Sequence, residues 1–211
     1  MKTISRATAI FFVLALAAVA QQAPASHGEP ASGGMTPQHS HAAGVGVSYA
    51  ELKNTVALLE RARQGTAKYQ DVHVAEADGY RAIGAGFPGM GIHYVRSLEA
   101  KGFDIEKPQI LLYEKNSSGG YSLVGVVYLW NGAAGPDGQP LDPPFPKSLA
   151  RWHRHTNICA LPGLANPHGL TEQQCREQGG HFVAEAPWMV HAWIWKDSPA
   201  GVFSDQNPAV R

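Results

Sequence analysis

Histidine is the residue type in this sequence best suited to chemistry, and four of the ten histidines lie in apolar segments typical of β-strands. His153 and His155 occur in the stretch Trp-His-Arg-His-Thr-Asn-Ile-Cys, residues 152–159. On a strand, alternate side chains share a face, so both imidazoles would point to the same side. On a helix the two rings would diverge by roughly 200°. The metal-binding interpretation therefore depends on a strand here.

Two further histidines have similar surroundings. His93 follows a glycine-rich turn in Gly-Ile-His-Tyr, and His191 lies in the last apolar stretch, residues 188–195. Buried imidazoles need partners for their ring nitrogens, and a shared divalent transition metal would satisfy all of them at once. We therefore predict that His93, His153, His155 and His191 bind one ion of zinc, copper or iron. The alternative is that His153 and His155 hydrogen-bond to backbone carbonyls or to carboxylates such as Glu114, while His191 stacks among tryptophans.

The ligand pattern resembles two known designs. Carbonic anhydrases and cupins hold a metal through a His-x-His strand and a distant histidine, although no glutamate follows His155 here at the short spacing that cupins use. An open coordination position would make the protein an enzyme that uses a metal-activated water or oxidative chemistry on a small molecule. We predict Glu114 as its general base and Asn157 or Tyr94 as a group that orients the substrate. The rival functions are a non-catalytic metal carrier and a protein that binds an apolar ligand.

The N-terminus predicts export to the periplasm or the extracellular space. Residues 1–20 contain Lys2 and Arg6, then an apolar run at 7–17 and an Ala-Val-Ala cleavage site, the pattern of a secretory signal peptide. The apolar run is too short for a comfortable membrane span, and no other stretch approaches about 20 apolar residues. We expect no stable span after cleavage. In an oxidising compartment, Cys159 and Cys175 are expected to form a disulfide.

The amino-acid composition argues against a nucleic-acid partner and separates a tether from a folded domain. The 17 basic and 17 acidic residues balance, so we expect no surface for nucleic acid, which would need a basic patch. Residues 21–47 are rich in Ala, Pro, Gly, Ser and His and contain almost no large apolar residue, which predicts a disordered tether. The remaining residues, 48–211, are predicted to form a single domain.

The pattern within this domain predicts an α+β fold. Ser48 and Glu51 form a capping box at the start of an amphipathic helix that runs to about Arg63. Two apolar runs, residues 108–114 and 121–130, flank a short Ser/Gly loop and predict an antiparallel hairpin. We therefore predict N-terminal helices packed on a mainly antiparallel β-sheet or half-barrel.

Overall fold

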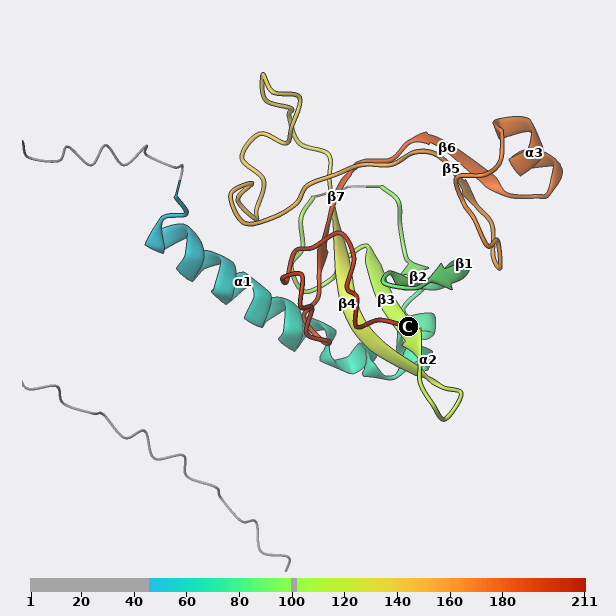
Figure 1. Cartoon of the computed structure of the whole chain (residues 1–211), viewed down its shortest axis with the longest axis horizontal. Coiled ribbons are helices and arrows are strands. Elements are labelled where there is room, and N and C mark those ends of the chain that lie inside the picture. The colour runs from blue at the N-terminus through green and yellow to red at the C-terminus, as the bar shows by residue number, and fades with distance from the viewer. Residues whose placement is uncertain (1–45, 100–101) are drawn as a thin grey trace, which may run out of the picture. The chain divides into compact units, whose positions relative to one another are not determined.

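The computed structural model describes residues 46–99 and 102–211 (Figure 1). The predicted signal peptide and residues 21–45 of the predicted tether lie outside the described residues. The described chain confirms the α+β prediction: it contains a helical N-terminal segment, an antiparallel five-stranded sheet that stays open, and a separate two-stranded sheet. In this part of the chain, no helix has the length and apolar character needed to cross a membrane.

The N-terminal segment contains α1 (Tyr49–Thr66), the 3₁₀ helix η1 (Ala67–Gln70) and α2 (Val72–Ala77). The predicted capping box is confirmed, since the Glu51 backbone N–H donates to Ser48 Oγ and the Ser48 N–H donates to the Glu51 carboxylate. This reciprocal pairing satisfies donors that the first helical turn leaves free. The C-terminal half of α1 packs on the sheet, whereas Tyr49 and Leu52 in its first half remain exposed.

The large sheet has the strand order β1-β2-β3-β4-β7. Its members are β1 (Arg81–Phe87), β2 (Gly91–Val95), β3 (Ile110–Lys115), β4 (Tyr121–Trp130) and β7 (Trp188–Ala192). The predicted hairpin is confirmed as β3 and β4, which pair in antiparallel register. β4 lies between β3 and β7 and is buried along most of its length, so it is an internal strand of the sheet.

The two faces of the sheet support different cores, because neighbouring residues of a strand point to opposite sides. Val126 and Tyr128 of β4 belong to the larger core, which the helical segment covers. Val127 and Leu129 belong to a smaller core on the other face, together with Met189 of β7. His93 and His191 are offset from Tyr94 and Val190 of the larger core by one residue, which places them on the smaller-core face.

A two-stranded arm completes the fold. It contains β5 (Thr156–Ala160), α3 (Glu172–Glu177) and β6 (His181–Glu185). In Figure 1 the arm and the start of α1 lie on opposite sides of the described structure. The predicted disulfide between Cys159 and Cys175 is confirmed and joins β5 to α3. Backbone hydrogen bonds from Gly84 and Ala85 to the loop after β5, both 3.2 Å long, attach the arm to β1.

The strand predicted over residues 152–159 is wrong in its first half, because β5 begins only at Thr156. His153 instead forms an isolated antiparallel bridge with Met189 of β7, and the His155 carbonyl accepts a hydrogen bond from Ala186. Asn157 has φ = 56°, a left-handed conformation that interrupts the alternation of side chains. The two histidines therefore lie in an irregular segment that connects the main sheet with the arm.

Candidate metal centre and adjoining cavity

The described chain brings the four predicted histidines together from three separate segments. His93 lies on β2 and His191 on β7, with β3 and β4 between them. Three strand spacings would separate their backbones by about 14 Å, yet the His93 and His191 ring centroids are only 6.1 Å apart. The sheet must therefore curve so that the two side chains converge.

His153 lies between the other members of the cluster. Its ring centroid is 5.1 Å from that of His191 and 5.2 Å from that of His155. With metal–nitrogen bonds of about 2.0–2.1 Å, two imidazoles on one tetrahedral ion have centroids about 5 Å apart. The two spacings of His153 thus match that of ligands to a shared ion, whereas the 6.1 Å between His93 and His191 is longer.

The described side chains, as they stand, do not form a metal-binding group. Within residues 46–99 and 102–211, no group of three or more His, Cys, Asp or Glu side chains is arranged to hold a metal ion as the side chains stand. We name His93, His153, His155 and His191 the histidine cluster.

His191 has the most informative environment in this cluster. Its side chain is buried, and its Nδ1 lies 2.7 Å from the carbonyl oxygen of Asp205. Since a carbonyl can only accept, Nδ1 carries the proton and Nε2 carries a lone pair. That Nε2 is buried and has no hydrogen-bond partner among the described residues. The structure therefore leaves an unused acceptor beside two other imidazoles.

Asp205 is a residue that sequence reasoning missed. Its carbonyl holds His191, and its carboxylate Oδ1 lies 3.4 Å from Nδ1 of His153, which also lies 3.2 Å from the carbonyl oxygen of Arg151. Through its carbonyl and its carboxylate, Asp205 orients the His191 and His153 rings. Asp205 belongs to an irregular segment with no periodic pattern, so no sequence signal could have linked it to the histidines.

Burial favours the neutral form of His93, His155 and His191. It lowers the pKa of His93 to about 4, an effect strengthened by His155 and partly opposed by a hydrogen bond to the Gly91 backbone. Burial likewise lowers the pKa of His155 to about 4, with His153 and His168 adding to the effect. The pKa of His191 is lowered well below its usual range, again mainly by burial. Neutral imidazole is the form that binds metals.

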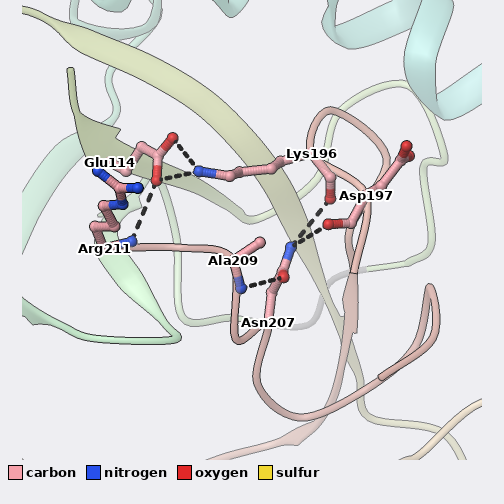
Figure 2. A network of polar contacts seen from close by, with 6 residues as sticks. All are labelled: Glu114, Lys196, Asp197, Asn207, Ala209 and Arg211. Carbon is pink, nitrogen blue, oxygen red and sulfur yellow. Dashed lines mark hydrogen bonds and ion pairs between the residues drawn. The ribbon is translucent and has the colours of Figure 1, made fainter. Parts of the chain in front are cut away.

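The structure does not bring Glu114 to the cluster. Its carboxylate lies 2.6 and 2.7 Å from Nζ of Lys196 and accepts a 3.3 Å hydrogen bond from the Arg211 backbone (Figure 2). Asn207 continues this network by donating to the carbonyls of Lys196 and Asp197. Glu114 thus anchors the C-terminal segment that contains Asp205, and we name these contacts the tail network.

The two predicted orienting residues also lie apart from the histidine cluster. Tyr94 follows His93 on β2 and points to the opposite face, where its ring packs 4.8 Å from that of Tyr113. Burial raises the pKa of Tyr94 to about 12. Asn157 is exposed, and the turn in its backbone directs the chain into the arm.

A cavity of about 380 Å³ adjoins the histidine cluster. It lies between β1, β2 and the arm, and both His93 and His155 line it. Most of its wall is apolar, with contributions from Ile83, Phe87, Met90, Ile110, Ile158, Val183 and Met189. His168 and His181 line it as well, and the His168 ring centroid lies 5.2 Å from that of His155. The site therefore combines neutral imidazoles with space for a small molecule.

Comparison with known proteins identified no relative of this chain. No protein-family model matches the chain, and neither the curated proteins nor the solved structures contain a match. A functional conclusion must therefore come from the geometry and chemistry of the site.

Proposed function

We propose that this protein is an exported, histidine-ligated metalloprotein with one metal ion, and that it acts as an enzyme on a small molecule. The observation that carries the proposal is the buried, unpartnered Nε2 of His191. An unsatisfied buried polar atom costs about 1–3 kcal/mol. A metal ion at Nε2 would remove that cost.

The second nitrogen of His191 supports the same conclusion. Histidines that bind metals usually donate their other ring N–H to a carbonyl or carboxylate, which fixes the tautomer and the ring orientation. His191 makes this contact with the carbonyl of Asp205. His153 directs its Nδ1 to the Arg151 carbonyl, which leaves its Nε2 available.

We assign His93, His153, His155 and His191 as the ligand set. Imidazole binds zinc, copper and iron well, so the donor set fits each of these metals. When bound, such a metal would supply Lewis-acid or redox chemistry. His93 and His155 line the cavity, so they would hold the ion on the side that a substrate approaches.

The cavity favours catalysis over metal carriage. A carrier or structural site is closed by protein ligands, whereas a catalytic site keeps a coordination position open. At a closed site, the ion would have no coordination position for a molecule that enters the cavity of about 380 Å³ beside His93 and His155. We therefore infer that the ion keeps one coordination position open to a substrate in the cavity.

Export is supported by two independent features. The N-terminal sequence has the pattern of a signal peptide, and the Cys159–Cys175 disulfide is typical of oxidising compartments.

Elemental analysis of the untagged protein, purified after export, tests the proposal. We expect close to one equivalent of zinc, copper or iron in the wild type and less than a tenth of that in the double variant His153→Ala, His155→Ala. His73→Ala is the matched control, because His73 is exposed on α2, and it should retain the metal. A folded wild-type protein that holds no metal and takes none up on dialysis would contradict the proposal.

A further inference from the structure

We infer that the cavity binds a neutral, mainly apolar molecule about the size of two fused rings, with one hydroxyl group directed toward His93 and His155. The inference rests on the proposed function only for the role of this molecule as substrate. Binding itself depends on the cavity, and it can be tested in metal-free protein.

The size and the wall of the cavity define the body of the ligand. A volume of about 380 Å³ lies at the lower end of the range for small-molecule sites, which are usually lined by apolar side chains. The wall includes surfaces from two segments: Ile83 and Phe87 on β1, and the cross-strand pair Ile158 and Val183 on the arm. A flat apolar body between these surfaces would bury both of its faces.

The charges around the cavity exclude a strongly anionic ligand. Among the described residues that line it, none is lysine or arginine, while Glu99 and Glu185 both contribute. Glu185 forms an ion pair with Arg154, so that positive charge is already used. In the metal-free protein, a carboxylate, sulfonate or phosphate in this cavity would lose its hydration shell without gaining a lysine or arginine partner.

The imidazoles define the polar end of the ligand. His93 and His155 are the lining residues that belong to the histidine cluster, and they approach the cavity from the main sheet and from the segment before β5. A hydroxyl group can donate to an imidazole nitrogen and can also bind a metal held there. One such group at this end would orient an otherwise apolar molecule.

The test measures binding of 2-naphthol, 2-methoxynaphthalene and naphthalene-2-sulfonate to the full-length metal-free protein by fluorescence titration at pH 7.5. We expect 2-naphthol to bind at one site. Naphthalene-2-sulfonate should bind at least tenfold more weakly because it is anionic, and 2-methoxynaphthalene about fivefold more weakly because it cannot donate. His93→Phe should reduce the difference between 2-naphthol and 2-methoxynaphthalene to less than twofold.

Two variants place an indole in the cavity from neighbouring strands. Ile158→Trp and Val183→Trp should each weaken 2-naphthol binding at least tenfold, and circular dichroism shows whether each variant is folded. Val56→Trp is the control, because Val56 is exposed on α1, and its affinity should stay within twofold of the wild type. Absence of saturable 2-naphthol binding, equal affinity for the sulfonate, or unchanged binding in both folded cavity variants would overturn the inference.

The metal content of the same variants separates this inference from the proposed function. Ile158→Trp leaves all four histidines in place, so it should retain metal while it loses 2-naphthol. If the wild type binds 2-naphthol but no metal, the proposed function fails and the cavity assignment stands. If it binds metal but no 2-naphthol, the cavity assignment fails alone.

Discussion

Two neighbouring polar regions depend on the same C-terminal segment, but their hydrogen bonding differs. In the tail network, Glu114, Lys196 and Asn207 each have short contacts to a partner (Figure 2). In the histidine cluster, Nε2 of the buried His191 has no hydrogen-bond partner within residues 46–99 and 102–211. Stability alone explains the first region. The second carries an energetic cost that stability does not explain, and such exceptions are expected at binding sites.

Acid should produce the largest difference between the two regions. Histidines titrate near pH 6.5 in an unfolded chain, whereas burial lowers the pKa of His93 to about 4 in the folded metal-free protein. Between these values the unfolded state binds more protons, so the free energy of unfolding falls as the pH falls. His93 alone should account for about 3 kcal/mol of this loss. Urea denaturation of the wild type and of His93→Phe at pH 7.5 and 4.5 measures it. The same pH dependence in both proteins would rule out this origin.

Metal should stabilise the folded protein by a similar amount at neutral pH. A ligand that binds only the folded state, at a free concentration a hundred times its dissociation constant, raises the free energy of unfolding by about 2.7 kcal/mol. We expect this gain in the wild type and in His73→Ala, but not in the double variant His153→Ala, His155→Ala. Thermal unfolding with and without metal measures the gain. An equal gain in the double variant would place the metal elsewhere.

Loss of the tail network should lower the free energy of unfolding of the metal-free protein. Glu114→Gln leaves Lys196 without its counter-charge, and breaking a fully buried pair costs about 3–5 kcal/mol. Because the Lys196 side chain is 29% exposed, we expect a smaller cost, about 2 kcal/mol. Glu106→Gln breaks the exposed pair with Arg61 and should cost under about 1 kcal/mol. Chemical denaturation compares the two variants, and equal effects would remove the assigned role of the network.

Asp205→Asn should have the smallest of these effects, a loss of metal affinity at the histidine cluster. Residues that orient metal ligands typically contribute about 10–100-fold to metal affinity. The Asp205 carboxylate is half-exposed and 3.4 Å from His153, so we expect a loss of about tenfold. The stability of the metal-free protein should not change. Competition with a chromophoric chelator measures affinity, with Asp137→Asn as the surface control. A loss of stability without a loss of affinity would make Asp205 merely structural.

Local patterns in the sequence predicted much of the fold. The Ser48–Glu51 capping box, the β3–β4 hairpin and the disulfide each depend on residue types within a short stretch or on a single pair of cysteines. The strand around His153 was predicted less well, because the bridge to Met189 and the left-handed Asn157 depend on tertiary contacts. Apolar surroundings selected four histidines whose rings lie near one another, but not His168, whose ring centroid lies 5.2 Å from that of His155.

The remaining parts of the site could not be predicted from local patterns. Glu114 was predicted as a general base, but its partner Lys196 is 82 residues away in the sequence. Asp205 contributes a backbone carbonyl to His191, and every residue type has such a carbonyl. The cavity forms only where the arm meets β1 and β2. Long-range packing determines all three features.

The most direct test of the central claim is electron paramagnetic resonance of the full-length protein with one equivalent of copper(II). His27, His39 and His41 would be replaced by alanine so that the N-terminal histidines cannot compete. We predict a single copper species with three or four nitrogen ligands, which loses nitrogen couplings in the His153→Ala, His155→Ala double variant. Several weak species, or a spectrum that the double variant leaves unchanged, would contradict a shared site at the histidine cluster.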